Sequence, residues 1–171
     1  MGRTEAYLGT LAFFFIAPGT AGGLVPWLIT HWRMGEGTSV GAVIVGGVMI
    51  AAGLAGLIEC FSRFARKGGG TPAPVAPTQH LVVTGLYRFV RNPMYVSVLV
   101  LVFGQMLVFS SAALLAYGVA LWTAFHVFVV FLEEQRLQRD FGDEYIDYCA
   151  NVPRWIPRIL PWRPEAAAPN K

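Results

Sequence analysis

Polar side chains able to bind or catalyse gather at two places in this sequence, each beside a long apolar segment. The first is GLYRFVRNPMY at residues 85–95, which holds two arginines, an asparagine and two tyrosines. The second is the acidic pair Glu133 and Glu134 at the end of an apolar run. Guanidinium groups bind carboxylates and phosphates, and carboxylates accept protons or bind cationic groups. Brought together, the two places would form a site for a polar ligand that carries charges of both signs.

The elements that must position these residues are four apolar segments. The chain has 171 residues, of which 55% are hydrophobic and 13% charged, with a mean hydropathy of +0.53. Residues 7–29, 40–58, 93–111 and 112–132 contain no Asp, Glu, Lys or Arg. Each is close to the roughly 20 residues that a helix needs to cross a membrane. The sequence therefore predicts an all-α, polytopic membrane bundle of about four transmembrane helices.

Two of these segments carry further structural information. Pro18, Gly19 and Pro26 interrupt the first, which predicts a kinked or broken helix whose freed carbonyls are covered by neighbouring helices. A cleaved signal peptide is the alternative for this segment, but its apolar run is long and Glu5 offsets Arg3. In the second segment, small residues recur at four-residue spacing and predict a face for close helix packing: Gly47, Ala51 and Ala55, with Ala52 and Gly56 beside them.

The basic residues predict the orientation. With four spans, twelve of the thirteen Lys and Arg residues fall on the side of the termini, and only Arg33 falls on the other. The positive-inside rule then places both termini and the 62–92 segment in the cytoplasm, and a bacterial inner membrane is the expected location. Basic residues beside a membrane meet anionic lipid headgroups, so the net charge of +3 requires no nucleic-acid partner.

The third and fourth segments predict a hairpin that joins the two polar places. About 17 residues lead from Pro93, suited to the first turn of a helix, to Ser110, a rise of about 26 Å. FSSAA leaves room for little more than a tight reversal, so Glu133 and Glu134 return to the depth of Arg91, Asn92 and Tyr95. The simpler interpretation is that charges merely reappear where helices leave the membrane. The adjacent acids and the nearby tyrosines favour instead a cytoplasmic pocket for a polar cofactor.

The domain organisation follows the same pattern. Residues 1–61 form an N-terminal two-helix region, 62–79 a cytoplasmic Gly/Pro-rich linker, 80–160 the core with the hairpin, and 161–171 a flexible tail. Cys60 and Cys149 form no CxxC pair, so neither a structural disulfide nor a metal site is expected. No motif indicates a protein partner.

The stretch HLVVTGLYRFVRNPMY, followed by EEQRLQRDFGDEYIDYCANVPRWIP, resembles the membrane methyltransferases that include isoprenylcysteine carboxyl methyltransferase and phospholipid N-methyltransferases. Their shared pattern is a Leu-Val pair, G-x-Y, Arg-His-Pro-x-Tyr, a transmembrane hairpin, a Glu pair, F-G-x-x-Y-x-x-Y and V-P. The resemblance covers residues 79–157, with all motifs in order.

This resemblance implies a bound S-adenosylmethionine and a lipophilic acceptor, either an isoprenylcysteine-like carboxylate or a phospholipid or lipid amine. It places cofactor contacts at nine positions: His80, Leu81, Val82, Tyr87, Asn92, Pro93, Met94, Tyr95 and Glu133. Glu134 and Arg91 are the catalytic candidates. Such a reaction is a direct displacement that requires alignment and exclusion of water. Glu134 or Glu59 could accept a proton from an amine, and His126 either lines a substrate tunnel or packs between helices.

Two departures from the family pattern bear on the substrate. Asn92 replaces the motif histidine, so this position forms hydrogen bonds but does not titrate near neutral pH. Relatives acting on prenylcysteine carry an arginine four residues before the cofactor-binding glutamate, and Val129 stands there in this chain. A lipid amine or another lipophilic nucleophile thereby gains weight as the methyl acceptor.

Two other classes of protein remain open. One is an NADPH-dependent membrane reductase of the sterol-reductase type, whose C-terminal helices resemble this family. The other is a non-enzymatic membrane module, in which Arg91 and Glu133 would matter only for folding. The short chain disfavours the reductase, and the ordered set of motifs disfavours the module.

Overall fold

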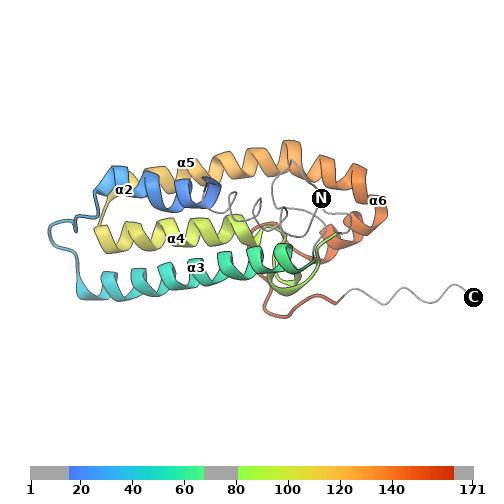
Figure 1. Ribbon diagram of the computed structural model, residues 1–171, viewed down its shortest axis with the longest axis horizontal. Helices are drawn as coiled ribbons and strands as arrows, with labels where there is room; N and C mark the ends of the chain where they lie inside the picture. The colour runs from blue at the N-terminus through green and yellow to red at the C-terminus, as the bar shows by residue number, and fades with distance from the viewer. Residues whose placement is uncertain (1–15, 68–80, 164–171) are drawn as a thin grey trace, which may run out of the picture.

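The computed structural model describes residues 16–67 and 81–163, and within these ranges every regular element is helical. Residues 16–19 lead into the π-helix η1 (Thr20–Leu24) and α2 (Val25–Thr30). The long helix α3 (Val40–Lys67) follows, then the short 3₁₀ helix η2 (Gly85–Arg88), α4 (Pro93–Phe109) and α5 (Ala112–Phe128). The π-helix η3 (Val129–Glu133) connects α5 to α6 (Glu134–Asn151). This confirms the all-α prediction, and Figure 1 shows α3, α4 and α5 running side by side.

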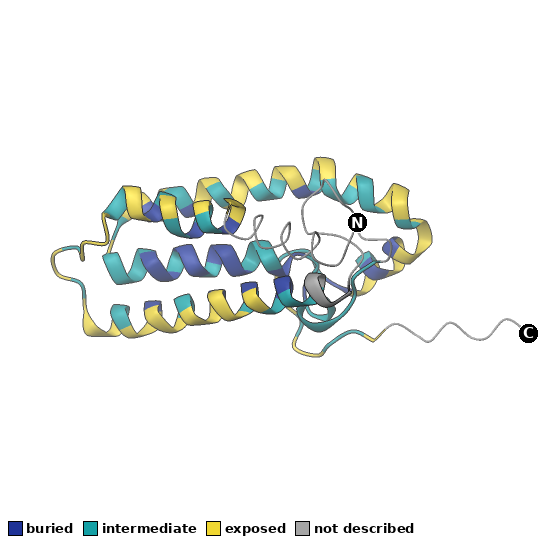
Figure 2. Cartoon of the chain, in the orientation of Figure 1, coloured by how far each residue is buried: buried dark blue, intermediate teal, exposed yellow. Residues whose placement is uncertain are grey.

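Among the described residues, two helices are long and apolar enough to cross a membrane. They are Val40–Arg63 within α3 and the continuous helix Ala112–Asn151, whereas the apolar helix Pro93–Phe109 is shorter. Large apolar side chains on α3 and on the continuous α5–η3 helix are exposed, among them Ile44, Ile58 and Phe131. Figure 2 shows that buried residues concentrate instead on α4, in the middle of the bundle. These features indicate a membrane protein, because apolar faces without a protein partner are stable in lipid.

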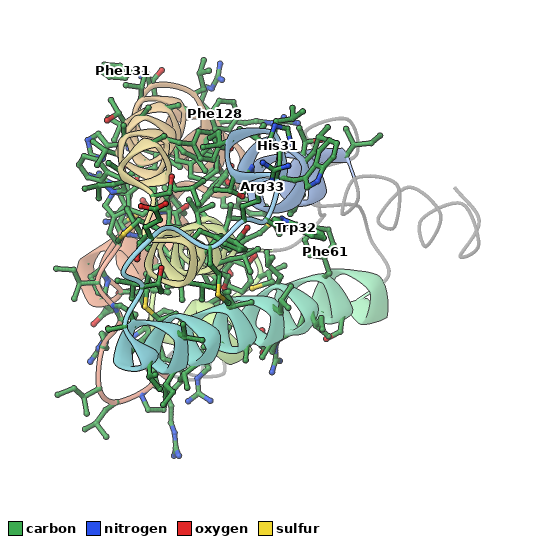
Figure 3. All side chains as sticks on the ribbon, turned by 90° about the vertical axis from the view of Figure 1, so that its left-hand side faces the viewer. His31, Trp32, Arg33, Phe61, Phe128 and Phe131 are labelled. Carbon is green, nitrogen blue, oxygen red and sulfur yellow. The ribbon has the colours of Figure 1, made fainter. Side chains whose placement is uncertain are left out.

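Helices α3 and α4 approach so closely that glycine is required between them. A Cβ on Gly46 would lie 2.5 Å from the backbone oxygen of Gly104, and one on Gly53 would lie 2.8 Å from that of Ser97. The same interface buries Leu57, Phe61 and Val102. Figure 3 shows Phe61 rising from α3 toward the rest of the bundle. Dispersion contacts at this short range hold helices together where no hydrophobic effect operates between them.

The small-residue face predicted for α3 is largely the wrong one. Gly47, Ala51 and Ala55 are exposed, and only Gly56 of the predicted set packs against α4, on the Ser97 side chain. A helix this rich in Gly and Ala carries several faces with four-residue spacing. The position of α4 selects the face that contains Gly46 and Gly53.

The irregularity predicted for the first segment takes the form of η1, between Pro18 and Pro26. Pro26 has no N–H, so a preceding carbonyl loses its helical donor. Gln105 Nε2 donates to the Gly22 carbonyl at 2.7 Å, and the Tyr117 hydroxyl donates to that of Ala21 at 2.9 Å. The described part of this segment is therefore stabilised as predicted, by donors from α4 and α5.

The two ends of the hairpin differ. Ser110 (φ 47°) and Ser111 make the tight reversal between α4 and α5, and Ser111 caps α5 by accepting from the Leu114 N–H. At the other end the chain does not stop at Leu132 but continues through η3 into α6. Gly142 interrupts α6 with φ 52° and ψ −125°, a backbone conformation that residues with a Cβ rarely adopt. After it the chain turns back beneath the bundle (Figure 1).

Candidate functional site

A cavity of about 190 Å³ lies at the end of the bundle where α4 begins and α5 continues into α6. Polar and aromatic groups line one part of it and apolar side chains the rest. The residues come from the first segment, from the stretch before α4, from α4 itself and from the α5–η3–α6 helix: Ala17, Pro18, Ala21, Leu81, Val82, Tyr87, Arg91, Asn92, Met94, Tyr95, Val98, Phe125, Val129, Glu133, Glu134, Leu137, Phe141, Tyr145 and Tyr148.

The α5–η3–α6 helix reaches this cavity with every fourth residue from Phe125 to Tyr145. In a regular α-helix of 3.6 residues per turn, such a stripe would rotate steadily away from one side. The wider π turn at Val129–Glu133 delays that rotation and keeps Glu133 and Leu137 facing the same side as Phe125. The π-helix therefore positions the acidic pair.

The charged centre of the cavity is Glu134 between two arginines. Arg91 Nη1 donates to Glu134 Oε1 at 3.0 Å, and Arg154 binds both carboxylate oxygens, at 2.7 and 2.8 Å. The side chains of Arg91 and Glu134 are only 14% and 17% exposed. The hydrogen bonds with Glu134 raise the pKa of Arg154 above its ordinary value. Two guanidinium groups therefore hold this carboxylate in one orientation.

Arg91 makes further contacts that leave part of its guanidinium available. Its Nη1 also lies 2.9 Å from Cys149 Sγ, and its backbone N–H donates to the Pro153 carbonyl. Arg91 Nε is buried and has no hydrogen-bond partner among the residues that the structure describes. A buried donor without an acceptor is costly, so this atom is suited to an anionic group of a ligand in the cavity.

Glu133 has a different environment from its neighbour. Its Oε2 accepts from the Tyr95 hydroxyl at 2.9 Å, and the Tyr95 ring packs on Phe125 with centroids 4.7 Å apart.

Tyr87, which also lines the cavity, has a buried phenol group. Burial, with smaller contributions from Cys60 and Glu133, raises the pKa of the Tyr87 phenol well above its ordinary value, so the hydroxyl stays protonated.

The C-terminal segment holds the stretch before α4 in place. The backbone N–H of Arg158 donates to Phe89 and that of Trp162 to Arg88, both at 2.9 Å. Asn92 Nδ2 donates to the Arg154 carbonyl at 3.2 Å, and the Tyr148 hydroxyl donates to the Tyr87 carbonyl at 2.7 Å. These bonds bring Arg154 to Glu134. Trp162 lies within the range predicted to be a flexible tail, yet it packs on Tyr148 with ring centroids 5.7 Å apart.

Comparison with known proteins gives this geometry a context. The family model described as phospholipid methyltransferase matches residues 42–144, more than half of the chain. The chain belongs to that family. It is also 39% identical over 82 residues to protein-S-isoprenylcysteine O-methyltransferase from Schizosaccharomyces pombe, and 31% identical over 80 residues to protein-S-isoprenylcysteine O-methyltransferase B from Arabidopsis thaliana. These matches cover 47% and 46% of this chain but only 34% and 40% of the two relatives.

The structure brings together most of the residues that the sequence predicts to form the site. Those that line the cavity are Leu81, Val82, Tyr87, Arg91, Asn92, Met94, Tyr95, Glu133 and Glu134. Pro93 does not line it; it is buried at the start of α4 and faces a separate groove beside α3. His80 lies outside the described residues. The roles of these residues in binding a cofactor remain predictions.

Several residues of the site were not predicted. The sequence places Arg154 only among the basic residues that predict the orientation, and no local pattern marks it as the bidentate partner of Glu134. Phe125, Leu137 and Phe141 could have been found from the four-residue repeat that continues past the apolar segment.

Two other candidates lie elsewhere. Glu59 pairs with Arg63 beside the groove that Pro93 also lines. His126 Nδ1 accepts from Trp155 Nε1 at 3.1 Å, which agrees with a packing role.

Proposed function

We propose that this protein is a membrane-integral, S-adenosylmethionine-dependent methyltransferase that acts on a lipophilic substrate. The observation that carries the proposal is the pairing of Arg91 with Glu134 and of Tyr95 with Glu133 around one cavity inside the family-matched region. The same cavity has an apolar wall that includes Val98, Phe125 and Val129. A polar wall suits a charged cofactor, and an apolar wall suits the hydrocarbon part of a lipid.

The residues present fit S-adenosylmethionine. Arg91 Nε, buried and without a partner among the described residues, would bind the cofactor carboxylate. Glu133 would bind its ammonium or ribose hydroxyls, and the aromatic and apolar residues Tyr87, Leu81 and Val82 would surround its adenine. When bound, the cofactor supplies an electrophilic methyl group on a sulfonium.

Glu134 serves in this proposal to position Arg91, not to accept a proton. Its two carboxylate oxygens accept three hydrogen bonds from two guanidinium groups, so they are already engaged by the protein. Glu59 lines a different groove. A carboxylate acceptor is already ionised at neutral pH and needs no base, whereas an amine acceptor must be deprotonated before attack.

Two chemical classes of acceptor fit the cavity. An isoprenylcysteine-like carboxylate agrees with the names of the relatives, and a phospholipid or lipid amine agrees with the family description. Val129 occupies the position at which prenylcysteine enzymes are expected to carry an arginine, which favours an acceptor without a carboxylate.

We further propose four membrane spans with both termini in the cytoplasm, which places the cavity at the cytoplasmic membrane surface.

Calorimetric titration of the detergent-purified protein with S-adenosylmethionine, and separately with NADPH, tests this function. The proposal predicts S-adenosylmethionine binding in the micromolar range that Glu133→Ala abolishes, with thermal unfolding used to verify that the variant is folded. Binding of NADPH alone would indicate a reductase. Binding of neither ligand by the folded protein would indicate a non-enzymatic module.

A further inference from the structure

An exposed apolar patch lies on the segment that follows α6. It consists of Ile156, Ile159 and Leu160, whose exposed fractions are 79%, 95% and 72%. Single apolar residues are ordinary on a protein surface, whereas several of them together mark a surface that another component covers. The patch does not line the cavity, and it lies beyond the residues that the family model matches, which end at 144.

The backbone that carries the patch is held in place by hydrogen bonds. The N–H groups of Arg158 and Trp162 donate to the carbonyls of Phe89 and Arg88, both at 2.9 Å. In return, Arg88 Nε donates to the Trp162 carbonyl at 2.6 Å. Because these bonds lie on both sides of residues 159–160, the exposure of the patch is that of a fixed surface and not that of a loose tail.

The same bonds determine the depth of the patch relative to the membrane spans. Residues 88–89 come shortly before the apolar helix α4, which begins at Pro93. Pro157, inside the patch segment, lines a groove together with Pro93 and Glu59, and Glu59 is the first charged residue after the apolar run of α3. The patch therefore lies where the apolar spans end, which is the level of lipid headgroups. Figure 1 shows the C-terminal segment beside this end of α3.

The charges around the patch are all positive. Residues 152–163 contain three arginines and no acid. Arg154 is bound inside the site, but Arg158 and Arg163 form no ion pair with any acid among the described residues. Apolar side chains flanked by guanidinium groups fit an anionic bilayer surface, where the apolar groups enter the acyl region and the guanidinium groups bind phosphates.

The second half of α6 has the opposite character. Asp143, Glu144 and Asp147 are exposed there. An anionic surface repels these carboxylates and attracts the arginines of the following segment. The patch segment, and not the end of α6, is thus the part of the C-terminal region that suits a membrane surface.

We propose that residues 156–163 form an interfacial anchor in the bilayer that holds α3 and α5. The apolar patch inserts into the outer part of the acyl region, and Arg158 and Arg163 bind the phosphates of anionic phospholipids. The partner is the surface of an anionic bilayer and not a single lipid in a pocket. The anchor lies at the same end of the bundle as the cavity, but the inference does not depend on the proposed function.

Fluorescence of an attached label tests the insertion without any methyl donor. Ile159→Cys in the full-length protein is labelled with an environment-sensitive, thiol-reactive fluorophore and reconstituted in vesicles of phosphatidylcholine and phosphatidylglycerol. We expect blue-shifted emission that is quenched by lipids with a nitroxide near the top of the acyl chain. Val48→Cys, exposed on the α3 span, should behave in the same way, whereas Glu144→Cys, exposed on α6, should show water-like emission.

Two controls make the result decisive. Cys60 is buried and Cys149 is partly buried, so labelled wild type measures the background. Thermal unfolding verifies folding, and Leu160→Cys provides a second position if Ile159→Cys does not fold. Water-like emission from the patch would overturn the proposal. A blue shift without quenching by lipid would also overturn it, because protein, such as a second copy of the chain, would then cover the patch.

The role of the arginines is tested with the same labelled protein. Nitroxide-labelled phosphatidylglycerol should quench the label with about fivefold preference over nitroxide-labelled phosphatidylcholine, as one arginine beside an anionic headgroup predicts. Arg158→Gln combined with Arg163→Gln should abolish this preference, and Arg163→Gln alone decides if the double variant does not fold. Arg33→Gln, at the opposite end of the bundle, should retain it. Equal quenching by both lipids, or a preference that survives in the folded arginine variant, would overturn the proposal.

Discussion

The two sides of α4 are built in different ways. Toward α3 the contact is made by backbone atoms, with Gly46, Gly53 and Gly104 allowing the helices to touch. Toward the α5–η3–α6 helix, the start of α4 borders a cavity. There the contacts are made by long polar and aromatic side chains, such as Tyr95 to Glu133 and, from the stretch just before α4, Arg91 to Glu134. The first side fixes the position of α4, and the second uses that position to place chemical groups. The close packing of α4 on α3 keeps the helix in place even though a cavity lies on its other side.

The largest effect is expected from filling the close contact between α3 and α4. Gly53→Leu would place side-chain atoms within the backbone of α4 near Ser97, and overpacking of this kind costs about 3 kcal/mol or more. Thermal unfolding of the purified protein should show a large drop in stability or no folded protein. Gly47→Leu is the matched control, since a Cβ there meets nothing within 4 Å. Equal stability of the two variants would show that α4 does not rest on this face.

The second-largest effect on stability is expected from mutating Glu134 at the charged centre of the cavity. Glu134→Ala leaves Arg91 and Arg154 beside a cavity without their acid, and removal of one partner of a buried ion pair costs up to about 3 kcal/mol. We also expect S-adenosylmethionine affinity to fall at least about tenfold, because Arg91 loses its orientation.

Asp140→Ala provides the comparison for Glu134→Ala, since it removes an exposed pair with Arg136 at 3.6 Å on the same helix. Such surface pairs contribute about 0–1 kcal/mol. If calorimetry and thermal unfolding give the same result for both variants, Glu134 is an ordinary surface acid and the charged centre has no special role.

A smaller loss of stability, with a loss of cofactor affinity, is expected from mutating Tyr95. Tyr95→Phe removes the hydroxyl that donates to Glu133 but keeps the ring against Phe125, so the affinity for S-adenosylmethionine should fall about tenfold with little change in fold. Calorimetry compares it with Thr123→Val, which removes an exposed hydroxyl bonded to the Val119 carbonyl on α5, away from the cavity. An unchanged affinity in Tyr95→Phe would contradict the assignment of Glu133 to the cofactor.

The smallest effect is expected where the C-terminal segment meets α5. Trp155→Phe removes the hydrogen bond to His126 next to Arg154, which should lower stability by about 1 kcal/mol and affinity only slightly. Thermal unfolding and calorimetry measure the two effects. A loss of affinity as large as that of Glu134→Ala would contradict this expectation. It would mean that the two hydrogen bonds from Arg154 to Glu134 do not hold Arg154 in place without the Trp155 contact.

Much of the site follows from sequence because helix length determines depth. The tight reversal at Ser110 brings Glu133 and Glu134 back to the depth of Arg91 and Tyr95, as the residue count predicts. The structure adds the pairing, with Arg91 bonded to Glu134 and Tyr95 to Glu133. Pro93 begins α4 as predicted, but it faces the groove and not the cavity. The depth of a residue follows from counting along the helix, whereas the side it faces depends on its neighbours.

The remaining features depend on contacts between distant segments. The face that α3 turns toward α4 could not be chosen from spacing alone, because Gly47 and Gly46 both belong to plausible small-residue stripes. The π turn that keeps Glu133 and Leu137 on the cavity side has no residue pattern of its own. Arg154 reaches Glu134 through backbone bonds between the C-terminal segment and residues 88–92, a pairing that no local pattern predicts.

Transfer of a labelled methyl group tests the central claim most directly. The protein is reconstituted in vesicles of mixed phospholipids with an added prenylcysteine and is incubated with S-adenosylmethionine carrying a tritiated methyl. The account predicts label in the organic-soluble fraction for the wild type and none for folded Glu133→Ala, with the labelled product identifying the acceptor as a carboxylate or an amine. Equal labelling by both proteins would contradict the assignment of the cavity as the site of methyl transfer.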